Sequence, residues 1–289
     1  MFKIIGSSEA KYLAATDILI GDMSNINYEF LLFNRPIILL ANEWVKNYFP
    51  DLGIKATIHE IEEAILRSIT YPSEFAEPRK LWLKKVIFLP EEGASKHYIN
   101  IALEKADFES PKFVLLDGNN CVRKTNIRPL YNELKSRNKD VEMINTISDI
   151  KDKYDQTIFI AAHFNDIKDI DYGYCIHIDH DLKAPSTANL SHAVKEYREN
   201  NYFENIHLHI TGGIAGKHRT QYVLGKNKER VVVGGYAKAD DLLVFNYNNV
   251  KEGVCKELGF NPSKPLVTYA PAGNKKYLKP GGSRPMQWP

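Results

Sequence analysis

Short apolar, β-branched runs alternate with amphipathic helical patterns along the chain, and this alternation constrains the fold more than any other feature. The runs expected to form strands cover residues 17–21, 36–40, 112–116, 141–144, 157–162, 173–178, 207–211 and 230–233. Strands that alternate with helices build parallel sheets through βαβ units. We therefore expect an α/β protein with two Rossmann-like parallel-sheet lobes, in which ligand-binding residues follow the carboxyl ends of the strands.

Helices are expected between these runs, at 25–33, 58–69, 78–86, 95–106 and 126–136. The helix at 58–69 has the clearest start signal. Thr57 precedes it and Glu60 follows three residues later, which is the pattern of a capping box.

The length of 289 residues suits two domains, because single hydrophobic cores stop growing at roughly 250–300 residues. The Glu-Ser-Pro segment at 109–111 is expected to be a linker. We predict an incomplete first lobe at 1–108, a second Rossmann-like lobe at 109–265, and a segment at 266–289 that starts a following lobe or is a truncated tail. An incomplete sheet would expose strand edges, so association with a second copy or another chain is expected.

Composition excludes several classes of protein. No run reaches the ~20 apolar residues that a membrane helix needs, and the N-terminus lacks a signal-peptide pattern, so a cytoplasmic location is expected. The three cysteines lie far apart without a CxxC pair, which argues against a disulfide framework and a structural zinc site. A net charge of +2 is too small to imply nucleic acid.

Basic residues gather in the predicted helix at 78–86. They are Arg79, Lys80, Lys84 and Lys85. The simplest prediction is a solvated helix face. The alternative is a weak contact with an anionic membrane surface.

A tight polar turn follows the first predicted strand and contains Asp22, Ser24 and Asn25. The free N–H groups of a following helix would attract phosphate, and Ser24 and Asn25 would add side-chain donors. Asp22 would orient the turn or a substrate hydroxyl. The alternative is that Asp22 and Ser24 only cap a helix.

The segments 15–25 and 28–39 resemble the Asp-x-Ser-Ser turn pattern of CDP-glycerol glycerophosphotransferases, enzymes that prime or polymerise teichoic acids. The Tyr and Ser of that pattern are Met23 and Asn25 here. Two later segments, 230–242 and 264–272, resemble the Gly-Tyr and Tyr-Ala-Pro elements of the same family.

The Gly-Tyr resemblance implies four further substrate-binding residues, Gly235, Tyr236, Lys238 and Asp240. The alternative for this element is a turn that closes a strand.

The segment 174–183 is similar to the family's histidine loop. The resemblance implies that His180 is the general base, that Asp179 or Asp181 orients its imidazole, and that Lys183 binds substrate. We therefore expect His180 and Asp181 to be catalytic. Asp181 stands where the family has glycine, which puts negative charge beside an anionic donor.

The order of these segments differs from the family, in which the histidine loop comes first and the Asp-x-Ser-Ser turn last. An Arg-x-His-Pro segment of the family has no counterpart here. Two explanations of this order stay open. The chain is a fragment across the junction of tandem transferase units, or it is the product of a rearrangement that lost half a lobe.

The resemblance implies a transferase of GT-B-like architecture that uses CDP-glycerol or a related CDP-alditol and a polymeric or lipid-linked acceptor. It implies no metal and no cofactor, and contact with the inner face of the membrane. The alternatives are a non-catalytic nucleotide-binding remnant and a sugar-nucleotide glycosyltransferase.

Two other readings of the residues compete. His163, His177 and Asp179, with His180 and Asp181, form a metal-binding alternative. The segment 211–218 superficially resembles a P-loop, but we expect a glycine-rich turn. His207 and His209 are expected to be sheet residues.

Overall fold

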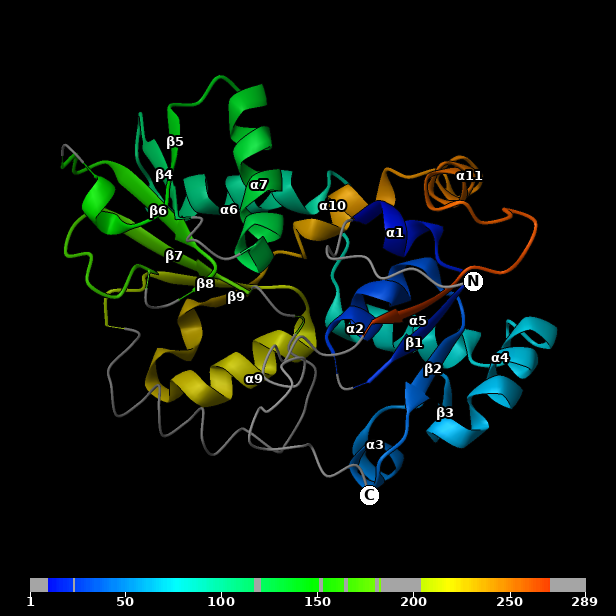
Figure 1. Ribbon diagram of the computed structural model, residues 1–289. Coiled ribbons are helices and arrows are strands. Elements are labelled where there is room, and N and C mark those ends of the chain that lie inside the picture. Colours follow the sequence, from blue (N-terminus) through cyan, green and yellow to red (C-terminus); the bar gives the residue numbers. More distant parts are fainter. Residues whose placement is uncertain are drawn as a thin grey trace, which may run out of the picture. The chain divides into compact units, whose positions relative to one another are not determined.

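The computed structural model describes residues 10–22, 24–116, 121–150, 153–163, 166–179, 182 and 204–270 (Figure 1). As expected, it is a mixed α/β protein with two parallel sheets, one of four strands and one of six, consistent with two Rossmann-like lobes. The contacts divide the chain into two compact units. Unit 1 comprises Met1–Leu83 and Val244–Pro289, and unit 2 comprises Lys84–Leu243.

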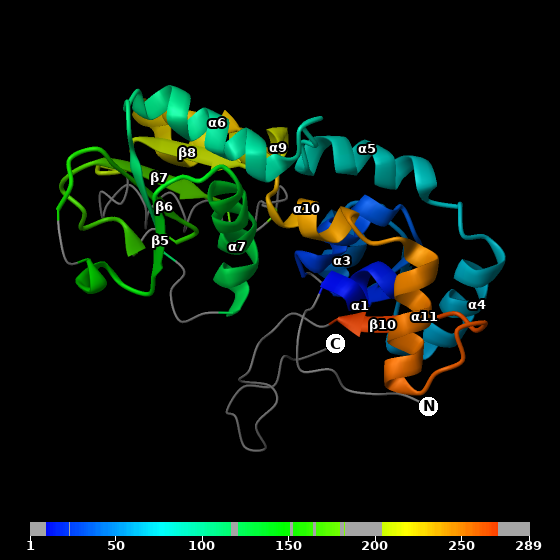
Figure 2. The same ribbon diagram turned by 90° about the horizontal axis from the view of Figure 1, so that it is seen from above.

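The sheet of unit 1 has the strand order β10-β1-β2-β3, and all its pairs are parallel. Its strands are β1 (Ile18–Gly21), β2 (Ile37–Leu40), β3 (Ile54–Ala56) and β10 (Val267–Ala270). Its helices are α1 (Ala10–Ala15), α2 (Ile26–Phe30), η1 (Leu31–Phe33), α3 (Glu43–Tyr48), η2 (Ile58–Glu60), α4 (Ile61–Thr70), most of α5 (Ala76–Val86) and α11 (Tyr247–Leu258). Strand β10, which Figure 2 labels, pairs with β1 and is the red arrow beside it in Figure 1, although almost 250 residues separate the two strands in sequence.

The pairing of β10 places the described start of the segment 266–289 in unit 1. Residues that resemble the opening of a following lobe therefore join the same sheet as β1. Two apolar clusters lie in this unit. Ile18, Ile20 and Ile38 pack with Ala64 of α4, and a second cluster joins Ala15 of α1 to Val254 and Leu258 of α11.

Gly53 allows β3 to lie close to β2. A Cβ atom at this position would fall 1.8 Å from the carbonyl oxygen of Ile37, and a backbone atom cannot move aside as a flexible side chain can. We expect Gly53→Ala to lower the free energy of unfolding by about 3 kcal/mol in urea titrations. The control is Gly253→Ala in α11, where a Cβ meets nothing within 4 Å and a gain of about 0.5–1 kcal/mol is expected. Equal stabilities for the two variants would contradict this reading of Gly53.

Arg79 is buried, so the prediction of a solvated basic face is wrong for this residue, whereas Lys80, Lys84 and Lys85 are exposed. Its Nε donates to Asn34 Oδ1 at 3.0 Å, and its Nη2 donates to the carbonyl oxygens of Asn34 and Pro72 at 3.2 and 3.1 Å.

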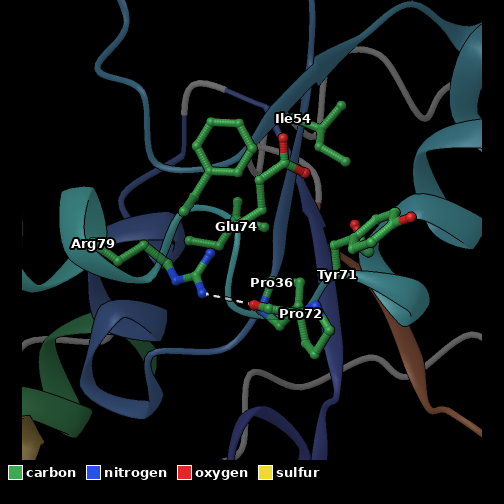
Figure 3. A pocket seen from close by; sticks show the side chains of 9 residues that line it. Pro36, Ile54, Tyr71, Pro72, Glu74 and Arg79 are labelled. Atoms are coloured by element: carbon green, nitrogen blue, oxygen red, sulfur yellow. Dashed lines mark hydrogen bonds between the residues drawn. The ribbon is translucent and has the colours of Figure 1, made fainter.

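Arg79 is one of the residues that line a small pocket (Figure 3). The volume of this pocket is about 10 Å³, which is room for about one water molecule. Burial lowers the pKa of Arg79 to about 10, so the side chain is still charged at neutral pH. Its charge lies at the carboxyl end of η1, where carbonyl oxygens attract cations.

The sheet of unit 2 has the strand order β5-β4-β6-β7-β8-β9, again with parallel pairs only. Its strands are β4 (Lys112–Leu116), β5 (Val141–Ile144), β6 (Thr157–Ala161), β7 (Tyr174–Ile178), β8 (Leu208–Thr211) and β9 (Val231–Val233). Its helices include α6 (Ala94–Ala106), α7 (Cys121–Ser136), η3 (Ile147–Asp149), α9 (Ile214–Leu224), η6 (Gly225–Arg230) and α10 (Lys238–Leu243).

Residues of α6 and α7, among them Tyr98, Ile99 and Leu130, pack on one face of this sheet, and Val223 and Leu224 of α9 pack on the other. The segment 109–111, expected to be a linker, joins α6 to β4 inside unit 2.

The expected strands at 112–116 and 141–144 are confirmed to the residue, and the other expected strands agree within one residue at each end. The capping box of Thr57 and Glu60 is confirmed, although its first turn is the 3-10 helix η2. No helix in the described ranges combines the length and apolar character needed to cross a bilayer.

Candidate functional site

The carboxyl edge of the unit 1 sheet carries the predicted polar turn. Strand β1 ends at Gly21, Asp22 follows directly, and α2 begins at Ile26. The two neighbours of β1 come from distant parts of the chain, because β2 follows it and β10 lies almost 250 residues later. In open α/β sheets a break of this kind in strand order marks where ligand crevices form, outside the carboxyl ends of the strands.

The backbone, more than side-chain caps, holds this turn. Asn27 N donates to Ser24 O at 3.2 Å, and Tyr28 N donates to Asn25 O at 2.9 Å. Ser24 Oγ accepts a long bond of 3.5 Å from Ile26 N, and the side chain of Asn25 makes no capping bond. Helix capping therefore does little to explain why these two half-buried positions, Ser24 and Asn25, carry polar side chains.

Asn27 is a residue of this turn that the sequence reasoning missed. It is fully buried, and its Nδ2 donates to the carbonyl oxygen of Asp22 at 2.5 Å. A Cβ atom at Gly21 would fall 1.9 Å from Asn27 Oδ1, so glycine at the end of β1 lets the amide approach. The sequence signal that could have identified Asn27 is the glycine that ends an apolar strand a few residues before it.

Asp17, at the start of β1, fastens three segments of unit 1. Its Oδ2 accepts from the backbone N of Leu266 at 2.7 Å and lies 2.7 Å from Lys251 Nζ, and Tyr247 donates its hydroxyl to Oδ1. Burial acts to lower the pKa of Lys251, but hydrogen bonds to Asp17 and Tyr247 and the charge of Asp17 outweigh it and raise that pKa. Asp17 therefore holds β10 and α11 against β1.

In unit 2 the predicted Gly-Tyr element lies at the amino end of α6. Asp240 accepts from the backbone N of Ala94 at 2.9 Å and of Ser95 at 2.7 Å, so its carboxylate caps this helix.

Gly235 has a φ of 102°, which favours glycine, and its carbonyl oxygen accepts from Tyr98 Oη at 2.7 Å. Tyr236 is buried and Lys238 begins α10. These contacts are those of a turn that closes a strand, and substrate binding by the four residues stays a prediction.

A buried chain of ionisable residues lies on the paired strands β7 and β8 and directly after β7. His177 Nδ1 and His209 Nδ1 are 3.1 Å apart, and His209 Nε2 lies 3.2 Å from Asp179 Oδ1. All three residues are at most 2% exposed. If neutral His209 donates from Nε2 to Asp179, its Nδ1 accepts from His177, and the chain has one consistent direction.

Three predicted residues that follow this chain, His180, Asp181 and Lys183, lie outside the described residues. Within the described ranges, no group of three or more histidine, cysteine or acidic side chains is arranged to hold a metal ion. His207, expected to be a sheet residue, accepts from the backbone N of Cys175 at 3.0 Å.

The glycine-rich segment at 211–218 combines a turn with the first residues of α9. Phe88 N donates to Gly212 O at 2.7 Å, and a Cβ atom at Gly213 would fall 2.5 Å from the carbonyl of Val86. Both glycines are buried. They serve close packing inside unit 2, which agrees with a turn and not with a P-loop.

The parallel sheets and the polar turn define a Rossmann-like α/β protein with a candidate ligand site at the carboxyl edge of the unit 1 sheet. A family model described as CDP-Glycerol:Poly(glycerophosphate) glycerophosphotransferase matches residues 4–53. The described part of the match runs from α1 through the turn and β2 to Gly53. A comparison with curated proteins finds no significant match. The family match indicates glycerophosphotransferase activity in general, through this one segment.

Proposed function

We propose that this protein transfers glycerol phosphate, or a related alditol phosphate, from a CDP-activated donor to a polyol-phosphate or glycan acceptor in surface-polymer synthesis. The observation that carries the proposal is the position of the family match, because residues 4–53 include β1, the polar turn at the sheet edge and β2. The proposal includes peripheral binding to the inner face of the membrane. Exposed Lys80, Lys84 and Lys85 would attract anionic lipid headgroups there.

The chemistry assigned to the site is an in-line displacement. An acceptor hydroxyl oxygen attacks the β-phosphorus of the donor, a new P–O bond forms, and the bond to the bridging oxygen breaks so that CMP leaves. His180 takes the hydroxyl proton, with Asp181 to orient it. Ser24 and Asn25 donate to the diphosphate, and Lys183 and Lys238 add positive charge. Asp22 accepts a hydrogen bond from a hydroxyl of the CDP-activated substrate. Gly235, Tyr236 and Asp240 contribute to binding of the acceptor substrate.

Ser24 gives the first test of this assignment. We expect Ser24→Ala to lower kcat/KM for CMP release from CDP-glycerol by about 10-fold or more, because a hydrogen bond to a charged group contributes about 1.5–3 kcal/mol. The assay measures CMP in the presence of an acceptor. Ser73→Ala, on an exposed loop of unit 1, is the control and should behave as the unchanged protein. Full activity in Ser24→Ala would exclude Ser24 from donor binding.

A second candidate is a nucleotide-binding module without catalysis. Asp240 favours it, because its carboxylate caps α6 where the resemblance implies substrate binding. Thermal shifts with CDP-glycerol, CDP-ribitol, UDP-sugars and CMP separate the candidates, since a ligand at 100 times its Kd stabilises by about 2.7 kcal/mol. A shift without CMP release identifies the module, and a shift confined to UDP-sugars identifies a glycosyltransferase.

A further inference from the structure

We propose that Tyr269 of β10 is a ligand-binding residue of the site at the Asp22–Asn25 turn, and that its ring stacks on the base of a nucleoside diphosphate. The inference rests on the proposed function for its ligand class. It divides the site into a nucleoside end, formed by Tyr269 and Asp22, and a phosphate end, formed by Ser24 and Asn25.

The strand register brings Tyr269 to the turn. In the parallel pair of β10 and β1, Tyr269 is opposite Ile20 and Ala270 is opposite Gly21, so Tyr269 reaches the edge where Asp22 follows β1. Burial raises the pKa of the Tyr269 hydroxyl, and the charge of Asp22 raises it further. The register therefore brings the phenol and the carboxylate to the same edge of the sheet, although 247 positions separate them.

The exposure of Tyr269 differs from that of its neighbours on the same face. Paired residues of adjacent strands point to the same side of a sheet, and Ile18, Ile20 and Val267 on this side pack into the core with α4. Tyr269 is 54% exposed, so its ring has a face available to a ligand at the open edge.

The chemistry of this end suits a nucleoside better than a phosphate. The Asp22 carboxylate would repel a phosphate but accept hydrogen bonds from ribose hydroxyls. A phenol ring carries no charge at neutral pH, and stacking of a base on an aromatic ring contributes about 1–3 kcal/mol. Ser24 and Asn25, which carry no charge, follow in the same turn and present donors to the diphosphate.

The experiment measures Kd by calorimetry for CMP, CDP-glycerol and inorganic pyrophosphate, with the full chain. We expect Tyr269→Ala to weaken CMP and CDP-glycerol binding by about 10–100-fold and to leave pyrophosphate binding unchanged. Tyr269→Phe keeps the ring and should change these constants less than about 3-fold. Tyr154→Ala, an exposed tyrosine of unit 2, is the control. Circular dichroism and ligand-free melting compare the folds of all variants.

Tyr269→Ala that folds normally and binds CMP as tightly as the unchanged chain would overturn the inference. So would an equal loss for CMP and pyrophosphate, which would indicate a damaged turn. The transferase proposal fails separately. If CMP binding depends on Tyr269 but no CMP is released from CDP-glycerol with any acceptor, the ligand-binding role of Tyr269 is supported and the proposed transfer reaction is rejected. Absence of CMP binding by the unchanged chain overturns both.

Discussion

Replacing His180 with alanine should lower the rate of CMP release from CDP-glycerol by about 10²–10⁴-fold, the range that a positioned general base supplies. An imidazole with a pKa near 6.5 can take the proton of an acceptor hydroxyl at neutral pH, whereas alanine cannot. The loss should fall on kcat, since the base acts as the acceptor attacks and contributes little to donor binding. Release of CMP with saturating CDP-glycerol and acceptor measures the effect.

The matched control is His218→Ala, which removes an exposed imidazole of α9 in the same unit and should leave the rate unchanged. Raising the pH from acid to neutral should increase kcat in the unchanged enzyme, because only a neutral imidazole accepts a proton, and this increase should be absent in His180→Ala. CMP release by His180→Ala at the normal rate would remove this residue from the mechanism.

Replacing Asp17 with alanine is expected to lower the free energy of unfolding by about 3 kcal/mol, because a mostly buried carboxylate that accepts from a backbone N–H, a hydroxyl and an ammonium group is lost. The two units need not unfold together, so hydrogen exchange at β10 is the better measurement. Amides of 267–270 should exchange faster in Asp17→Ala, while those of β4 and β6 in unit 2 should not change.

Asp51→Ala provides the comparison for Asp17. Asp51 pairs with Lys55 at 2.8 Å, but its side chain is 76% exposed, and such pairs contribute about 0–1 kcal/mol. If the two aspartate variants lose the same stability, the buried contacts of Asp17 do not fasten β10.

The strands of unit 2 could be predicted because the sheet buries both of their faces. Four of the five residues of β4 and all five of β6 are buried, which requires the continuous apolar runs seen in the sequence. The partner of each strand could not be predicted in the same way. Nothing in the periodicity of 267–270 indicates that these residues pair with β1, because pairing depends on tertiary contacts made across the intervening chain.

In the candidate site, too, some features could be predicted from the sequence and others could not. The polar turn after β1 could be predicted from residue types, and the structure places Asp22, Ser24 and Asn25 together at the sheet edge. The supporting residues were missed or misjudged. Asn27 and Arg79 are polar in sequence, and only the surrounding carbonyl groups and packing explain why they are buried. Asp240, which the resemblance implies as a substrate-binding residue, caps α6 in the structure, and its binding of substrate stays a prediction.

The discontinuity of unit 1 has a consequence for biosynthesis. Residues 84–243 of unit 2 can leave the ribosome and collapse around their own core while translation continues. Until residue 270 has emerged from the ribosome, β1 lacks its partner β10, and the edge of the sheet at β1 stays open. During that interval the nascent chain is vulnerable to wrong strand addition at this edge, so chaperone dependence and aggregation should be most sensitive to changes that slow the arrival of β10.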